Sequence, residues 1–358
     1  MKFYMPVRVF DETECVAAHA KDIAAFGNKA LIVTGRHSAK ACGALDDVTA
    51  ALSANGKEYC LFDQIEENPS VETVRKGALY GMESGADFVI GIGGGSPMDA
   101  AKAIAHLMYL QDADSDLYDK TLSPEALPVI AVPTTCGTGS EVTGVSVLTV
   151  HEKNTKMSIP YKIFPKLALI DGKYLRSAKY AMIRDTAVDA LAHMIESYES
   201  TSADDYSRAA VLYGLSVWKR SKDIISGKTE ASDENYADMM RASAFAGIAI
   251  AQTGTSIPHA LSYILTYDLK MPHGRACGYF LKNYLKEAGQ EDRDQILQAA
   301  GFADFDSFAA YMDSLYEGET VPAETLQRAY DAVVQNTARL KGCRFHADAE
   351  VLKRIAGL

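Results

Sequence analysis

An alternation of short apolar segments with helical segments through the first half of the chain most constrains its fold. The strand-like segments occupy residues 29–35, 57–63, 87–93 and 127–133, and similar pieces follow at 144–150 and 166–171. The residues between the early strands carry helical periodicity and tend to end at glycine. Consecutive parallel strands need crossover connections, which are usually helices. The pattern therefore predicts a parallel, doubly wound sheet.

The second half of the chain reads differently. After about residue 177 the strand signals fade, and Ala, Leu, Met, Arg and Glu recur at helical spacing over 183–199, 205–222 and 235–251. A chain of 358 residues is also too long for one ordinary core. We therefore predict an α/β domain with a parallel, Rossmann-like sheet over 1–177, and an all-α domain over 178–358.

Charge and composition exclude several classes of partner. The net charge of −11 argues against nucleic acid, which needs a basic surface. No apolar run approaches the ~20 residues of a membrane span, and the N-terminus lacks the apolar core and cleavage site of a signal peptide. The six cysteines are scattered with no CxxC pair. These features predict a cytoplasmic protein with reduced thiols and no membrane partner.

A glycine-rich loop follows the strand at 87–93. It reads GIGGGSPMDAAKAIA (91–105) and opens a helix, with Ser96 expected as the N-cap and Asp99 as a capping-box acid. Free N–H groups and the helix dipole at such a turn favour a phosphate group. The loop matches neither the Rossmann GxGxxG nor the Walker pattern, so a plain, well-capped turn is the alternative to phosphate binding.

A second loop, PTTCGTGSEVTG (133–144), carries hydroxyls and glycines directly after a strand. Nucleotides lie at the carboxyl ends of parallel strands. By itself the loop is equally compatible with an ordinary Ser/Thr-rich connection. Together with the glycine loop it favours a dinucleotide site.

Asp189 and His193 stand out in the apolar stretch VDALAHMIE (188–196), because residues four apart share one face of a helix. A buried acid and imidazole either pair with each other or share a metal ion. His259 and His273 supply two further imidazoles downstream. A carboxylate with three neutral imidazoles would suit Fe²⁺ or Zn²⁺.

The order and spacing of four motifs resemble the iron-containing (group III) alcohol dehydrogenase family, and in particular its 1,3-propanediol dehydrogenase-type members. The motifs are GGGSPMDAAKAIA, PTTCGTGSEVT, VDALAHMIE and PHALSYILTYDLKMPHG. The resemblance implies the fold shared with dehydroquinate synthase, in which residues 1–177 would form the nucleotide-binding α/β domain and residues 178–358 the helical metal-binding and catalytic domain.

The resemblance also implies roles for individual residues. The metal ligands would be Asp189, His193, His259 and His273. The residues that contact the cofactor would be Gly94, Gly95, Ser96 and Asp99 at the pyrophosphate, Thr134, Thr135, Thr138 and Ser140 along the second loop, and Lys156 at a ribose.

Two departures from the family pattern carry information. NAD-preferring members often have an aspartate after the first strand of the nucleotide domain, where this chain has Gly35, followed by Arg36, His37 and Ser38. Glycine, a cation and a hydroxyl would accept a 2′-phosphate, so we expect NADP(H) to be preferred over NAD(H). Tyr263 replaces a family histidine implicated in proton transfer. It is either a proton relay or a packing and orienting phenol.

The predicted activity is hydride transfer between NADP(H), or NAD(H), and a small primary alcohol, diol or aldehyde, with the metal lowering the pKa of the alcohol. The alternatives are a sibling dehydrogenase for a polyol or hydroxy acid, a lyase of the dehydroquinate synthase type, and a non-catalytic nucleotide-binding protein. The resemblance further implies a homo-oligomer, a dimer or larger.

Overall fold

Two compact units make up the chain. The structure, a computed structural model, describes residues 3–153, 155–318 and 320–358. The α/β unit comprises the described residues of Met5–Thr135 and Gly139–Ala178, and the helical unit comprises residues 3–4, Cys136–Thr138 and the described residues of Lys179–Leu358. The domain boundary predicted after residue 177 stays a prediction.

A six-stranded parallel sheet forms the centre of the α/β unit, which confirms the predicted fold class. Its order is β1-β8-β5-β4-β2-β3. The strands are β1 (Arg8–Asp11), β2 (Lys29–Thr34), β3 (Glu58–Phe62), β4 (Phe88–Gly93), β5 (Val129–Pro133) and β8 (Leu167–Ile170). Five of them lie within segments expected from the sequence. The edge strand β1 was not expected.

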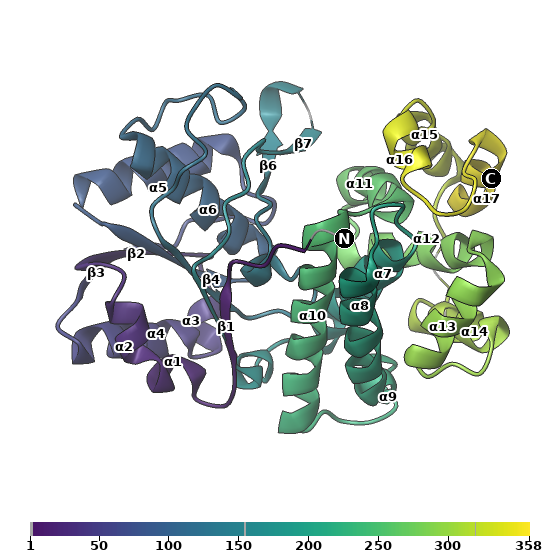
Figure 1. Cartoon of the computed structure of the whole chain (residues 1–358), viewed down its shortest axis with the longest axis horizontal. Coiled ribbons are helices and arrows are strands. Elements are labelled where there is room, and N and C mark those ends of the chain that lie inside the picture. Colours follow the sequence, from purple (N-terminus) through teal and green to yellow (C-terminus); the bar gives the residue numbers. More distant parts are fainter. Residues whose placement is uncertain (1–2, 154, 319) are drawn as a thin grey trace. The chain divides into compact units, whose positions relative to one another are not determined.

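Helices cover both faces of this sheet (Figure 1). Helices α5 (Val71–Glu83) and α6 (Gly95–Leu110) cover one face, and α1 (Cys15–Ala18), α2 (Ala20–Ala24), α3 (Ser38–Ala41) and α4 (Ala44–Ala54) cover the other. Because successive strand residues point to opposite faces, Leu31 and Val89 pack in the core under α5 and α6, whereas Ile32 and Ile90 pack in the other core. Burial on both faces explains the continuous apolar runs in the sequence.

An antiparallel hairpin and three short 3₁₀ helices complete the α/β unit. The hairpin pairs β6 (Val147–Val150) with β7 (Thr155–Ser158). The 3₁₀ helices are η1 (Ser140–Val142), η2 (His151–Lys153) and η3 (Gly172–Leu175). Segment 144–150 was expected to be strand-like, and β6 forms there, outside the main sheet.

The helical unit is arranged around α7 (Tyr180–Tyr198), which packs against α8, α10, α11 and α12. Its elements after α7 are α8 (Asp205–Trp218), η4 (Lys219–Ser221), α9 (Lys222–Ile225), α10 (Asp233–Thr253), α11 (Ile257–Leu269), α12 (His273–Glu287), α13 (Gln290–Ala299), α14 (Phe305–Leu315), α15 (Ala323–Val334), α16 (Thr337–Lys341) and α17 (Ala349–Ala356). Because neighbouring helices surround α7, its Asp189 and Glu196 are buried. This confirms the mostly helical second half.

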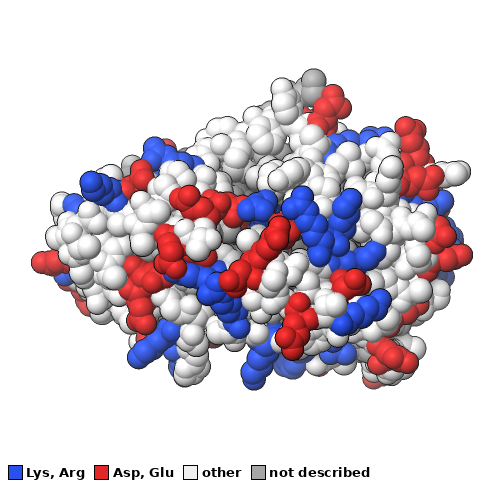
Figure 2. Space-filling view, turned by 90° about the horizontal axis from the view of Figure 1, so that it is seen from below, with Lys and Arg blue, Asp and Glu red and all other residues white. Residues whose placement is uncertain are grey.

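None of the described helices combines the length and apolarity that a bilayer crossing requires. On the face drawn in Figure 2, acidic and basic side chains are interspersed.

Candidate metal centre and cofactor loops

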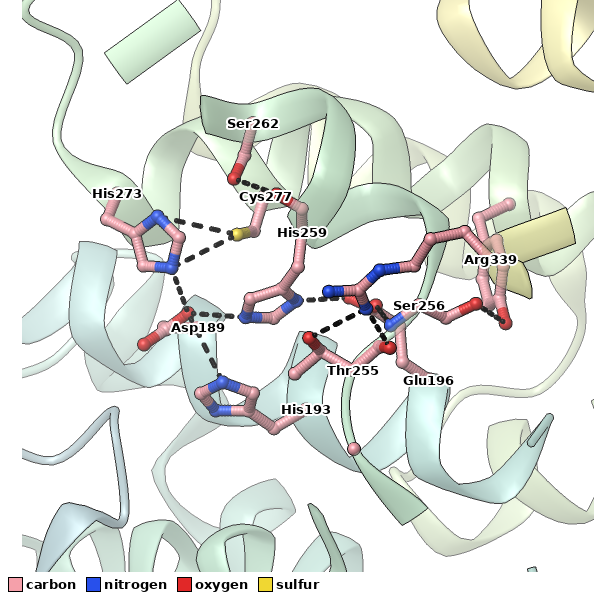
Figure 3. Close-up of polar contacts among 12 residues, drawn as sticks. Asp189, His193, Glu196, Thr255, Ser256, His259, Ser262, His273, Cys277 and Arg339 are labelled. Carbon is pink, nitrogen blue, oxygen red and sulfur yellow. Dashed lines mark hydrogen bonds and ion pairs between the residues drawn. The ribbon is translucent and has the colours of Figure 1, made fainter. Parts of the chain in front are cut away.

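The four predicted metal ligands come together in the helical unit (Figure 3). Helix α7 carries Asp189 and His193 one turn apart, α11 carries His259 in its first turn, and α12 begins at His273. One carboxylate oxygen, Asp189 Oδ1, lies 4.0 Å from His193 Nε2, 3.4 Å from His259 Nε2 and 3.8 Å from His273 Nε2. All three imidazoles therefore present the same nitrogen to one oxygen.

The chemistry of these atoms fits a shared cation. Asp189 is 2% exposed and His259 3% exposed. Among the described residues, neither Asp189 Oδ1 nor His259 Nε2 has a hydrogen-bond partner, although both atoms are buried. Buried polar atoms without partners are costly and uncommon. A divalent cation held by these donors would satisfy both atoms.

Hydrogen bonds on the far side of two imidazoles orient their Nε2 atoms. His193 Nδ1 lies 3.1 Å from the Gly137 carbonyl oxygen, and His259 Nδ1 lies 2.5 Å from Glu196 Oε1. In both cases Nδ1 donates, so Nε2 carries the lone pair that a metal ligand needs. Gly137 belongs to the segment Cys136–Thr138, which lies with the helical unit.

The electrostatics of these residues favour a positive charge beside Asp189. Burial raises the pKa of Asp189, but His193, His259 and His273 outweigh it and hold that pKa below the usual range. Burial lowers the pKa of His193, which keeps its imidazole neutral. Burial also lowers the pKa of His259, yet Cys277 and Glu196 raise it well above its usual value. The net effect is to draw positive charge to a position between buried acids.

Two residues of this centre were not singled out from the sequence. Glu196 is fully buried, and its second oxygen, Oε2, accepts the Ser256 N–H at the start of α11. Cys277 Sγ lies 3.8 Å from His273 Nε2. Within the described residues, the donors of Asp189, His259, His273 and Cys277 all lie within 4.8 Å of one another, a set that does not include His193. The i, i+4 spacing of His273 and Cys277 was the available signal.

Tyr263 lies beside the same centre. Its ring stacks against His273, with centroids 6.0 Å apart and an interplanar angle of 17°. Burial raises the pKa of the phenol. Its predicted catalytic role stays a prediction.

The glycine loop differs from expectation at its cap. Helix α6 begins at Gly95, and its N-cap is Gly94 rather than Ser96, with no side-chain cap bond. Ser96 Oγ accepts the Asn68 N–H at 3.0 Å instead. Gly93 has a φ of 147°, and a Cβ on Gly94 would meet Thr135 Oγ1 at 3.0 Å. The two predicted cofactor loops therefore touch, and a side chain at Gly94 would crowd Thr135.

Asp99 connects the loops instead of capping the helix. Its carboxylate accepts Ser140 Oγ at 2.6 Å and the Val147 N–H at 2.9 Å. Lys102, fully buried and not singled out from the sequence, donates to Ser140 Oγ at 2.6 Å. Lys156 Nζ donates to Asn68 Oδ1 at 2.6 Å. The contacts to cofactor predicted for these residues stay predictions.

The remaining predicted cofactor residues are distributed over both units. Thr134 is buried and follows β5 in the α/β unit, whereas Thr138 lies with the helical unit. Gly35 follows β2, and Ser38 is the first residue of α3.

A pocket of about 550 Å³ lies in the α/β unit, beside the residues that follow β2. It is lined by Arg36, His37, Gln64, Ile65, Glu66, Thr73 and Lys76. Its lining includes the expected Arg36 and His37 but not Gly35 or Ser38. Thr73 and Lys76 come from α5 and were not recognised in the sequence.

Two family models match the chain. Residues 6–172 match the model described as iron-containing alcohol dehydrogenase, and residues 183–332 match the C-terminal model of the Fe-containing alcohol dehydrogenase family. Among curated relatives, a long-chain primary alcohol dehydrogenase of Thermoanaerobacter ethanolicus is 35% identical over 72% of this chain and 66% of its own length. Lactaldehyde reductase of Escherichia coli K12 is 31% identical over 72% of this chain and 68% of its own.

Solved structures agree with this assignment. An iron-containing alcohol dehydrogenase from Thermotoga maritima has a TM-score of 0.87 at 34% identity, covering 100% of this chain and 99% of its own. Sulfoacetaldehyde reductase of Bifidobacterium kashiwanohense, solved with NAD⁺, has a TM-score of 0.87 at 25% identity, covering 99% and 97%. The chain spans about two thirds or less of the first curated relatives, and only 34% of aldehyde-alcohol dehydrogenase 2 of Entamoeba histolytica. The matches to both halves of the sequence and to the whole fold show that the chain belongs to the iron-containing alcohol dehydrogenase family.

Proposed function

We propose that the chain is a metal-dependent alcohol dehydrogenase and aldehyde reductase that moves a hydride between NADP(H) and a small primary alcohol, diol or aldehyde. The observation that carries this proposal is the convergence of three histidine Nε2 atoms on Asp189 Oδ1, at 3.4–4.0 Å. The related alcohol dehydrogenases and lactaldehyde reductase support the class of reaction.

In this proposal Asp189, His193, His259 and His273 would hold Fe²⁺ or Zn²⁺. When bound, the cation supplies the positive charge that lowers the pKa of an alcohol, and the nicotinamide supplies the hydride acceptor. Glu196 and the Gly137 carbonyl keep His259 and His193 in the ligand tautomer. Tyr263 is proposed to orient the substrate or relay a proton beside His273.

A metal titration with a matched activity assay tests the proposal. The protein, freed of metal by chelation, is loaded with Fe²⁺ or Zn²⁺, and NADPH and NADH oxidation is followed with a panel of short aldehydes. We expect one metal per chain and metal-dependent oxidation, both lost in Asp189→Asn and retained in His346→Gln, whose side chain is 89% exposed. Failure to bind metal, or no oxidation with any aldehyde, would contradict the proposal.

The preference for NADP(H) is proposed from the pocket after β2. Arg36 and Lys76 bring two cations to it, beside His37 and the Thr73 hydroxyl. Its one acid, Glu66, already accepts hydrogen bonds from Ser70 and Thr73. Two cations suit a 2′-phosphate better than an uncharged ribose.

Replacing the two cations tests the cofactor preference. Arg36→Ala and Lys76→Ala should each raise the KM for NADPH about 10-fold or more, because a charged hydrogen bond is worth ~1.5–3 kcal/mol. The KM for NADH should stay unchanged. Lys40→Ala is the matched control, because Lys40 is a cation on the nearby helix α3 that does not line the pocket. Equal losses for both cofactors would contradict the preference.

We also propose that the chain works as a homo-oligomer in the cytoplasm. Light scattering on the purified protein measures the oligomeric state, and a monomer would contradict it.

A further inference from the structure

Cys277 occupies an unusual position for a buried cysteine. It is fully buried, and its Sγ lies 3.8 Å from His273 Nε2 and 4.0 Å from His273 Nδ1. Other buried cysteines of the helical unit face hydroxyl groups instead. Cys343 Sγ lies 3.1 Å from Ser256 Oγ, and Cys136 Sγ lies 3.2 Å from Thr186 Oγ1. Cys277 thus has its thiol among metal-ligating groups rather than among packing partners.

Two glycines bring this thiol to the centre. A Cβ on Gly274 would lie 1.9 Å from the Asp185 carbonyl oxygen and 2.9 Å from Asp189 Cβ, and a Cβ on Gly278 would lie 2.6 Å from Val188 Cγ1. The backbone of α12 therefore passes very close to α7. One turn of helix separates His273 from Cys277, so the close approach brings both side chains toward Asp189 (Figure 3).

The donor atoms lie close to the spacing that the ligands of a single ion adopt. Bonds of about 2.0–2.3 Å place the ligands of one cation within roughly 4.6 Å of one another. The donors of Asp189, His259, His273 and Cys277 lie within 4.8 Å of one another. Asp189 Oδ1 and His259 Nε2, buried and without a hydrogen-bond partner among the described residues, lie 3.4 Å apart in the same place. Two independent observations, the buried atoms that lack hydrogen bonds and the nearby sulfur, thus mark one position.

We propose that Cys277 is a further donor of the metal centre, bound through Sγ as a thiolate beside Asp189 and the histidines. This inference rests on the metal site of the proposed function and goes beyond its four ligands. When the metal–sulfur bond forms, the thiol proton leaves to solvent and no electron is transferred. A soft thiolate shifts the selectivity of the centre toward zinc and away from harder cations.

Cobalt substitution tests the proposal spectroscopically, with no need for turnover. The full chain, freed of metal by chelation, is loaded with Co²⁺. We expect visible d–d bands, which report a bound ion, together with a near-ultraviolet sulfur-to-cobalt charge-transfer band. In Cys277→Ser the charge-transfer band should disappear while the visible bands persist. Cys60→Ser, on β3 of the α/β unit, should keep both.

The outcomes separate this proposal from the proposed function. Visible bands without a charge-transfer band in the natural chain, or a band that survives in Cys277→Ser, would overturn the sulfur ligand and leave the metal centre standing. No stoichiometric cobalt binding would overturn both.

If Cys277→Ser does not fold, a measurement on the natural chain still tests the sulfur ligand. X-ray absorption of the zinc-loaded protein should show a sulfur neighbour at about 2.3 Å. A shell of nitrogen and oxygen alone would refute the proposal. Where the variant folds, its zinc affinity should fall at least 10-fold in a chelator competition, and an unchanged affinity would also count against the sulfur ligand.

Discussion

Glu196 shows how one buried carboxylate organises the metal centre at the scale of a residue. Its Oε1 accepts the His259 Nδ1–H, and its Oε2 accepts the Ser256 N–H that precedes α11. The same side chain therefore sets the tautomer of a predicted ligand and positions the helix that carries it. Carboxylates behind ligating histidines act in this way in many metal sites.

Replacing Glu196 by Gln should weaken metal binding without removing a ligand. An amide can present an N–H where Oε1 now accepts, so the correct tautomer of His259 is no longer enforced. We expect a 10- to 100-fold loss in metal affinity, measured by competition with a chelator.

Glu199→Gln is the matched control. Glu199 is also fully buried, and burial raises the pKa of its carboxyl to about 7. None of the described hydrogen bonds joins its side chain to a predicted ligand. The Glu199→Gln variant should bind metal as tightly as the natural chain does. A similar loss of affinity in Glu196→Gln and Glu199→Gln would show a general effect of packing.

Glu141 provides a prediction for pH. Burial raises the pKa of this carboxyl from 4.5 to about 7, although the backbone and Lys102 act in the opposite direction. In the unfolded chain the group ionises near 4.5, so between these values the folded state binds more protons. The free energy of unfolding should therefore fall as the pH rises from 4.5 to 7, by up to ~3 kcal/mol.

Glu141→Gln should remove this part of the pH dependence, because an amide does not titrate. Urea unfolding between pH 5 and 8 measures the slope for both proteins. Parallel slopes would show that Glu141 ionises normally in the folded state.

At the scale of elements, the crossing of α7 and α12 determines whether the ligands meet. Gly274 and Gly278 leave no side chain between the two backbones, so His273 comes within 3.8 Å of Asp189. Any larger residue must separate the helices, and interiors packed at crystal-like density have little room to adjust. Gly274, the glycine of the family motif PHG, therefore acts through packing, and so does Gly278 one turn later.

Gly274→Ala should separate the helices and disrupt the centre. The added Cβ would overlap the Asp185 carbonyl oxygen, and overpacking of this kind costs about 1–3 kcal/mol or more. We expect a lower melting temperature together with a loss of metal affinity. Gly289→Ala, whose Cβ would meet no atom within 4 Å, should lose far less stability and keep the metal. Unchanged metal affinity in Gly274→Ala would disprove this account.

At the scale of the whole molecule, the predicted metal ligands and the pocket proposed for the cofactor phosphate belong to different units. The four predicted metal ligands lie in the helical unit, and the pocket with Arg36 and Lys76 lies in the α/β unit. A ligand that binds only the folded state stabilises it by mass action.

Metal binding should therefore protect the helical unit first. At a concentration 100 times its Kd, a metal adds about 2.7 kcal/mol to the free energy of unfolding. Hydrogen exchange should slow in α7, α11 and α12 when zinc is added, and chelation should reverse the change. In Asp189→Asn zinc should have no effect. Protection confined to the strands of the α/β unit would contradict the assignment of the site.

Much of this architecture could be read from local patterns. Five strands of the main sheet lie within the expected apolar segments, because burial on both faces leaves an unbroken apolar run. Strand β1 was missed, since a four-residue edge strand with one partner, β8, carries too little apolar sequence to stand out. The cap of α6 was predicted wrongly because Ser96 has a competing partner, the N–H of Asn68.

The sequence by itself determined the parallel sheet, the helical second half and the identity of four candidate ligands, because these depend on periodicity and on spacing within a single helix or motif. Only the tertiary structure decided that Cys277 and Glu196 lie beside these candidates and that the Gly137 carbonyl contacts His193. It also decided that Thr73 and Lys76 line the pocket beside Arg36. Contacts between residues distant in the chain arise from how helices and strands pack, and local patterns carry no record of which side chains that packing brings together.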